Sequence, residues 1–327
     1  MVRLVAALTH HETTVTGLAT TPRGLAFSTS TDKKLAAFEL RVDGATNLAT
    51  IEPTGHFRWP TGLVAGTTAS GNWVMTGALD GRACWWRVAN AGSVVASVTR
   101  TATWDCREPI TDISSGTFGG SEVVVAVTRG GSLVSWSNPG DVAGEQGDPR
   151  PTFAVKVTNL GLSLACVTEL GFFAADFAGN LWHVDPRGDR QPSIARKFGN
   201  KQVTSLAWLG DKGTQLLVGL DAGPIIGWNF GNGGVLRPTQ RFPGHAGGVE
   251  ALSPWFDEDG GMVGFFSGGL DGDLAAWSLK ETTPVARVKL PGGHARRLCF
   301  HEGLGLLIGG DTGSHVTVWE AVADERR

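Results

Sequence analysis

The stretch Ser267-Gly-Gly-Leu-Asp271-Gly-Asp-Leu274-Ala-Ala-Trp277-Ser-Leu279 decides the fold of this chain. An apolar run, Met262 to Phe266, comes directly before it and is typical of a buried strand. Leu-Asp-Gly-Asp is a tight-turn signal, and the apolar residues that follow predict a second strand containing a Trp. We therefore expect a β-hairpin here.

The same phrase recurs along the whole chain. Each copy has a turn followed by a short strand that ends in an anchor residue, usually Trp, and the anchors stand at positions 38, 86, 136, 184, 228, 277 and 319. Consecutive anchors are 42 to 50 residues apart, which leaves room for four short strands in each unit. Seven units of this length predict an all-β, seven-bladed β-propeller.

The repeats resemble those of WD40-repeat proteins, and the resemblance covers essentially the whole chain. It depends on an Asp-Gly turn six residues before a Trp and on a Gly-His dipeptide about 25 residues upstream of the turn. In that family, His, Ser or Thr, Asp and Trp form a hydrogen-bonded structural tetrad inside a blade. Two units match this tetrad in full, with His56, Thr76, Asp80 and Trp86 in one and His245, Ser267, Asp271 and Trp277 in the other.

Other units match the tetrad in part. The first has His11, Ser28 and Asp32, but Phe38 replaces the Trp and cannot donate a hydrogen bond. The last has His294, Asp311 and Trp319 with a longer turn, and the third to fifth units lack the Gly-His dipeptide. Because buried polar groups must satisfy one another, we interpret the tetrad residues as structural rather than catalytic.

The resemblance also predicts the domain organisation. We expect residues 1–327 to form a single propeller. The apolar run Val2 to Leu8 should pair in the last blade and close the ring, because the chain ends soon after Trp319. Residues 322–327 should form a mobile tail.

Composition points to a soluble intracellular protein, cytoplasmic or nuclear. The chain has 47 Gly, 12 Trp, 15 Phe and no Tyr, as expected for short strands joined by tight turns. No apolar run approaches the roughly 20 residues that span a bilayer, and the first residues do not read as a secretory signal. The four cysteines are scattered, so we expect no metal site, and no cofactor motif was found.

The sequence predicts a partner-binding surface in the connections between blades. These connections should surround the central axis on one face, and Trp and Arg are the residue types that most often dominate interface energy. We expect a mildly basic docking face for other proteins, through acidic or phosphorylated segments. Its candidate residues are Arg58, Trp59, Arg107, Lys201, Arg296 and Arg297.

We interpret the protein as a non-catalytic interaction scaffold, an adaptor or a subunit of a multiprotein complex. One alternative is a propeller enzyme or sugar-binding propeller, although Ser-X-Asp-X-Gly-X-Thr-Trp boxes and Tyr are missing. A second is a local basic patch that binds RNA or phosphoinositide. A net charge of −3 disfavours broad nucleic-acid or membrane binding.

Overall fold

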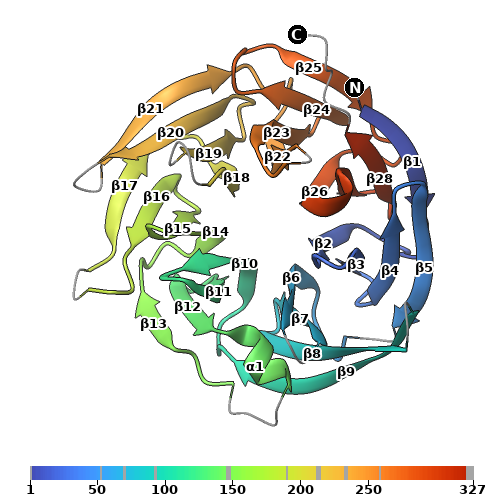
Figure 1. Ribbon diagram of the computed structural model, residues 1–327. Helices are drawn as coiled ribbons and strands as arrows, with labels where there is room; N and C mark the ends of the chain where they lie inside the picture. The colour runs from blue at the N-terminus through green and yellow to red at the C-terminus, as the bar shows by residue number, and fades with distance from the viewer. Residues whose placement is uncertain are drawn as a thin grey trace.

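The computed structural model is a ring of seven four-stranded antiparallel sheets (Figure 1). It describes residues 2–51, 54–68, 71–91, 94–144, 149–188, 191–210, 215–231, 235–257 and 259–321. The expected all-β, seven-bladed propeller is therefore confirmed. The expected tail at 322–327 lies outside the described residues.

Each blade contributes one inner strand to the wall of the central channel. In all seven blades, the inner strand shifts register against the second strand after its first residue, which marks a β-bulge at its second residue. The inner strands are β2 (Val15–Thr20), β6 (Pro60–Thr68), β10 (Ile110–Phe118), β14 (Leu162–Thr168), β18 (Val203–Trp208), β22 (Val249–Phe256) and β26 (Ala295–His301).

The second and third strands form the middle of each blade. Several second strands are buried along their whole length, because neighbouring blades cover both of their faces. The second strands are β3 (Leu25–Ser30), β7 (Gly71–Ala78), β11 (Ser121–Thr128), β15 (Gly171–Asp176), β19 (Gln215–Leu220), β23 (Met262–Gly269) and β27 (Leu306–Asp311). The third strands are β4 (Leu35–Arg41), β8 (Arg82–Ala91), β12 (Ser132–Ser137), β16 (Asn180–Val184), β20 (Ile225–Gly231), β24 (Asp273–Ser278) and β28 (Val316–Ala321).

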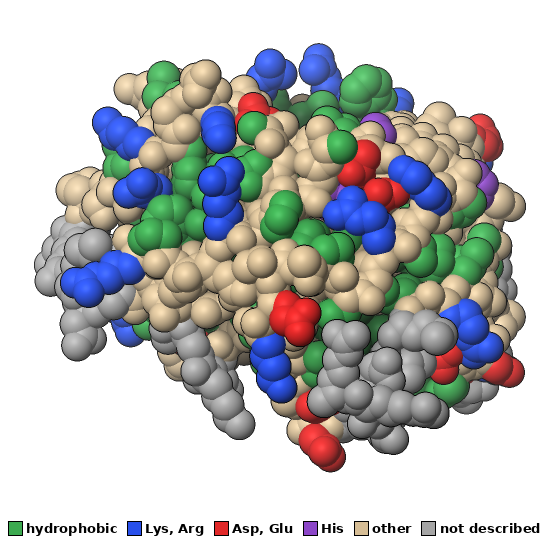
Figure 2. All heavy atoms as spheres, turned by 90° about the horizontal axis from the view of Figure 1, so that it is seen from above, with side chains coloured by type: hydrophobic (Ala, Val, Ile, Leu, Met, Phe, Trp, Pro, Cys, Tyr) green, Lys and Arg blue, Asp and Glu red, His purple; other side chains and the backbone are tan. Residues whose placement is uncertain are grey.

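The outer strands form the rim of the ring. Charges of both signs are scattered among neutral and hydrophobic side chains on the part of the rim that Figure 2 shows. The outer strands are β5 (Gly44–Ile51), β9 (Val94–Asp105), β13 (Phe153–Lys156), β17 (Ser193–Lys197), β21 (Val235–Phe242), β25 (Pro284–Lys289) and β1 (Val2–Leu8). The only helical segments in the described residues are α1 (Pro139–Gly144) and the 3-10 turn η1 (Glu302–Leu304).

The N-terminal strand closes the ring, as the sequence predicts. β1 pairs antiparallel with β28, with Val2 opposite Ala321 and Leu8 opposite Val316. The blue and red ends of the chain meet there in Figure 1. Blade 7 therefore consists of β26, β27, β28 and β1, and both ends of the chain hold it together.

The core is divided among the junctions between blades. The described residues form seven clusters of buried apolar side chains, one between each pair of neighbouring blades. Between blades 2 and 3, for example, the rings of Trp85 and Trp136 meet edge to face at 5.2 Å. The ring is thus stabilised by repeated contacts between neighbours, and its loops are held on a rigid frame.

Candidate docking surface

The His, Ser or Thr, Asp and Trp residues of blades 2 and 6 form internal hydrogen-bond chains. In blade 6, His245 Nδ1 lies 2.9 Å from Asp271 Oδ1 and His245 Nε2 lies 2.8 Å from Ser267 Oγ. Trp277 Nε1 donates to the same hydroxyl at 2.7 Å. Burial lowers the pKa of His245, which favours a neutral imidazole in this chain.

Blade 2 repeats this arrangement with a threonine. His56 Nδ1 lies 3.2 Å from Asp80, His56 Nε2 lies 3.0 Å from Thr76 Oγ1, and Trp86 Nε1 donates to that hydroxyl at 3.1 Å. Asp80 also accepts the backbone N–H groups of Phe57 and Arg82, each at 3.0 Å. These contacts satisfy the polar groups of the constellation within the blade and fix the turn that contains Asp80.

Blade 1 completes its tetrad with a second histidine. His11 Nδ1 faces Asp32 at 3.0 Å, and a carboxylate only accepts, so this nitrogen carries the proton. His11 Nε2 then accepts from Ser28 Oγ at 2.8 Å, and His10 Nε2 donates to the same oxygen at 3.2 Å. His10 thus supplies the donor that Phe38 lacks, and its ring packs 5.8 Å from the Phe38 ring.

Blades 3, 4 and 7 use other acceptors for their indoles, whereas the buried Trp228 Nε1 of blade 5 has no hydrogen-bond partner among the described residues. In blade 4, Trp182 donates to Asp176 at 2.8 Å, two residues before the predicted anchor at position 184. In blade 7, Trp319 donates to Thr317 at 2.9 Å. Asp311 there accepts backbone N–H groups of its own turn, and its hydrogen bonds among the described residues do not include the His294 imidazole. The partial tetrad expected in the last blade therefore does not form.

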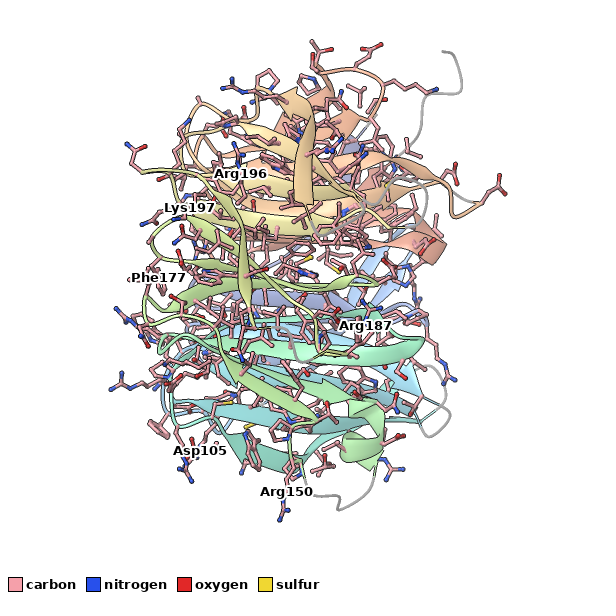
Figure 3. The ribbon with its side chains drawn as sticks, turned by 90° about the vertical axis from the view of Figure 1, so that its left-hand side faces the viewer. Asp105, Arg150, Phe177, Arg187, Arg196 and Lys197 are labelled. Carbon is pink, nitrogen blue, oxygen red and sulfur yellow. The ribbon has the colours of Figure 1, made fainter. Side chains whose placement is uncertain are left out.

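One face of the ring gathers exposed apolar side chains. We call it the upper face; it consists of the connections from each outer strand to the next inner strand and the turns between second and third strands. Among the described residues, nine large hydrophobic side chains are exposed, and five of them lie on this face: Phe57, Trp59, Leu160, Phe177 and Leu270. Figure 3 places Phe177 on one side of the ring and Arg187, from a connection between third and outer strands, on the opposite side.

The upper-face turn of blade 2 organises the largest aromatic and basic group. Phe57 and Trp59 are 60% and 56% exposed. The Arg82 guanidinium lies 5.1 Å above the Phe57 ring, in cation–π geometry. We call the set Phe57, Arg58, Trp59, Arg82 and Arg107 the blade-2 patch.

Backbone hydrogen bonds bring the blade-2 patch together around one turn. Leu79 N–H donates to the Trp59 carbonyl at 3.0 Å, and Cys106 N–H donates to the Gly81 carbonyl at 2.8 Å. Gly81 itself has φ +82°, the left-handed conformation that favours glycine in this tight turn. The three connecting segments of the patch are therefore held side by side.

The arginines of the blade-2 patch keep their charge available. Among the residues that the structure describes, Arg58, Arg82 and Arg107 form no ion pair. The neighbouring Glu108 has other partners, since it accepts from Thr128 at 2.5 Å and lies 3.6 Å from Lys156. The patch is thus positively charged around two exposed aromatic rings.

The six predicted docking residues fall into two groups. Arg58, Trp59, Arg107 and Lys201 lie in upper-face connections, as expected, with Lys201 in the segment after β17. The expectation that Arg296 and Arg297 lie in such a connection is wrong, because both belong to the inner strand β26. β26 begins at Ala295 and has its bulge at Arg296, so both arginines belong to the strand and not to the connection before it.

Arg296 and Arg297 instead face the central channel. Arg296 forms an ion pair with Glu250, so the bulge residues of blades 6 and 7 pair with each other. Arg297 reaches across the ring, donates to the Thr61 carbonyl at 2.9 Å and lies 3.6 Å from Asp112. The channel cavity beside them measures about 160 Å³.

The channel carboxylate Asp112 is held in an unusual environment. Burial raises the pKa of Asp112 to about 6, and the Arg297 guanidinium opposes that rise. Asp112 Oδ2 also accepts the Ala165 N–H at 3.1 Å. Arg297 and Asp112 thus tie blades 7, 2, 3 and 4 together around the axis.

Sequence reasoning missed Arg82, Leu160, Phe177 and Leu270 on the upper face. Leu270 and Phe177 flank the turn aspartates Asp271 and Asp176, so their place in the repeat was a usable signal. Leu160 adjoins Phe177, whose N–H donates to the Gly161 carbonyl at 3.4 Å. The apolar part of this face is therefore spread over blades 2, 4 and 6.

Comparison with known proteins agrees with the architecture. No helix within the described residues is long and apolar enough to cross a membrane. No curated protein matches the chain significantly. The family model described as WD domain, G-beta repeat matches residues 236–278, which cover β21 to β24 with the tetrad of blade 6. This repeat and the seven blades of common topology show that the chain belongs to the WD40-repeat propeller family.

Proposed function

We propose that the protein is a non-catalytic scaffold or adaptor, or a subunit of a multiprotein complex, that holds partner proteins against its upper face. The observation that carries this proposal is the gathering of five exposed large hydrophobic side chains on that face. Exposed apolar patches mark interaction sites, and two of these five side chains, Phe57 and Trp59, lie two residues apart in one connection. A rigid ring with several separated patches can hold more than one partner.

The chemistry of the upper face favours an acidic or phosphorylated partner segment. Trp59 and Phe57 provide aromatic contact area, and Arg58 and Arg107 provide charge without ion-pair partners among the described residues. Lys201, in the connection between blades 4 and 5, adds a positive charge to this face. Arg296 and Arg297 are not part of this proposal, because their charges are engaged inside the channel.

The blade chemistry supports a non-catalytic role. The His, Ser and Asp groupings that resemble a catalytic triad are engaged in hydrogen bonds within blades 1, 2 and 6. In each of these groupings a second side chain donates a hydrogen bond to the hydroxyl oxygen, namely His10 in blade 1, Trp86 in blade 2 and Trp277 in blade 6. These hydroxyls, on Ser28, Thr76 and Ser267, are also fully buried, so a substrate has no access to them.

Affinity purification with quantitative mass spectrometry tests the proposal. The upper-face variant combines Phe57→Ser, Arg58→Glu and Trp59→Ser, and the matched control is Val42→Ser, which is exposed between β4 and β5 on the opposite face. We expect the upper-face variant to lose partner proteins that the control retains. Equal recovery by both would contradict the proposal, and partners lost after nuclease treatment of the wild-type sample would favour nucleic-acid binding instead.

A further inference from the structure

A groove opens on the rim between the outer strands of blades 2 and 3. Its volume is about 620 Å³, much larger than the channel cavity. One wall is the end of β9 and the following connection, and the other is β13 with the third strand β12. The lining residues used below are Trp104, Cys106, Arg107, Val134, Ala154 and Lys156.

The groove exists because the outer strand of blade 3 is short and has a small side chain at a key position. β13 has 4 residues, against 12 in β9. Phe153 and Val155 pack toward the core between blades 3 and 4, which leaves Ala154 exposed on the groove side. A larger side chain at 154 would fill this space.

The floor of the groove is the open edge of the core between blades 2 and 3. Trp104 and Cys106 are only partly buried and pack against that core, which includes the buried Val134. The apolar surface is therefore already assembled and held by two blades. A preformed concave apolar surface of this kind accepts an apolar side chain at low reorganisation cost.

The Arg107 guanidinium lies at the mouth of the groove, whose lining also includes the carboxylate of Asp105. Arg107 belongs both to the groove and to the blade-2 patch, so the two surfaces are continuous. Asp105 uses Oδ1 to accept the Arg107 N–H at 2.7 Å, and Lys156 lies 3.6 Å from Glu108. The guanidinium of Arg107 is left without an ion-pair partner among the described residues.

We propose that the groove and the blade-2 patch together bind one linear peptide segment of a partner, rich in Asp and Glu and followed by an apolar side chain. The carboxylates pair with Arg58, Arg82 and Arg107, and the apolar side chain enters the groove against Trp104 and Val134. Charge complementarity and the continuity through Arg107 select this occupant. The inference rests on the proposed function and adds the partner's chemistry and a second contact site.

Selection from a displayed library of random twelve-residue peptides tests the inference without a known partner. Selected peptides are synthesised and their dissociation constants are measured against the wild-type protein, the upper-face variant and three further variants. Ala154→Trp fills the groove from an exposed position, and Arg107→Glu reverses the charge at its mouth. Ala7→Trp, at an exposed position of the outer strand β1, is the matched control for the added indole.

We expect enriched peptides that combine acidic residues with a large apolar residue. Their affinity should fall at least about 10-fold with Ala154→Trp and with Arg107→Glu, as for the loss of an interface anchor, and should not change with Ala7→Trp. Unchanged melting temperatures of the variants establish that the ring is intact.

Other outcomes separate this inference from the proposed function. Peptides that lose affinity in the upper-face variant but bind Ala154→Trp normally would overturn the groove while leaving upper-face docking in place. Enriched peptides without acidic residues would overturn the charge assignment. A library that yields no specific peptide would overturn the inference, whereas the mass-spectrometry comparison of the upper-face variant would still decide the proposed function.

Discussion

Replacing His10 tests the substitute tetrad of blade 1. His10 Nε2 is the second hydrogen-bond partner of Ser28 Oγ, at 3.2 Å, and takes the place of the indole in blades 2 and 6. His10→Ala removes this donor and opens space beside the buried Phe38. Phe38→Trp then offers an indole N–H to the same hydroxyl. We therefore expect the second substitution to rescue the first.

The magnitudes follow from these contacts. Loss of one hydrogen bond to a buried hydroxyl and of ring packing should lower the free energy of unfolding by about 2–3 kcal/mol in His10→Ala. Phe38→Trp alone overpacks the site while His10 is present and should cost about 1–3 kcal/mol. The double variant should recover about 2 kcal/mol relative to the sum of the single changes.

Urea unfolding of the four proteins in this cycle measures the coupling. His10→Ala combined with Phe38→Leu is the control, because leucine adds no donor, and it should show no recovery. The reasoning is refuted if the double variant with Phe38→Trp loses as much stability as the two single variants added together. Rescue by Phe38→Leu of the same size would show that packing alone explains the effect.

Four further expectations concern the stability of the ring. Asp271→Ala should lower the melting temperature, with a loss of about 1–3 kcal/mol in the free energy of unfolding, while partner binding at blade 2 persists. Lost binding at an unchanged melting temperature would show that Asp271 serves binding and not the stability of its blade. Burial lowers the pKa of the tetrad histidines, so below pH 6.5 the unfolded chain binds more protons than the folded one. The melting temperature should therefore fall as the pH drops from about 7 to 5, and a melting temperature independent of pH would contradict this. Arg297→Met should lower the free energy of unfolding by about 3 kcal/mol, because Asp112 loses its counter-charge. Adding Asp112→Asn should restore much of that stability, as measured by urea unfolding. Lys33 has φ +67° in the turn of blade 1, so Lys33→Gly should raise the midpoint by relieving about 1 kcal/mol of strain; a lower midpoint would argue against it.

The repeat made the fold predictable from the sequence. The spacing of the anchors defines seven hairpin units, and the apolar run from Val2 to Leu8 has no place except beside the last blade. Both features depend on local signals, namely tight turns and strand periodicity, which can be recognised without knowledge of tertiary contacts. The family resemblance also predicted the contacts of His56 and His245 within their blades.

The surface was less predictable because it depends on tertiary contacts. The inner strand β26 begins at Ala295 and bulges at Arg296, which places Arg296 and Arg297 in the channel wall instead of the expected loop. His10 became a hydrogen-bond donor only through its proximity to Ser28, eighteen residues away. The rim groove depends on the short β13 and on Ala154, whose importance appears only when blades 2 and 3 are placed side by side.

Hydrogen exchange on a co-purified complex tests the central claim, docking on the upper face, most directly. Exchange of each peptide segment is compared between the isolated protein and the complex with its principal partner. We expect slower exchange in the segments that contain Phe57 to Trp59, Leu79 to Arg82 and Cys106 to Glu108. Protection confined to the opposite face, such as the turn at Val42 or the segment around Arg187, with unchanged exchange in the blade-2 patch, would contradict the account.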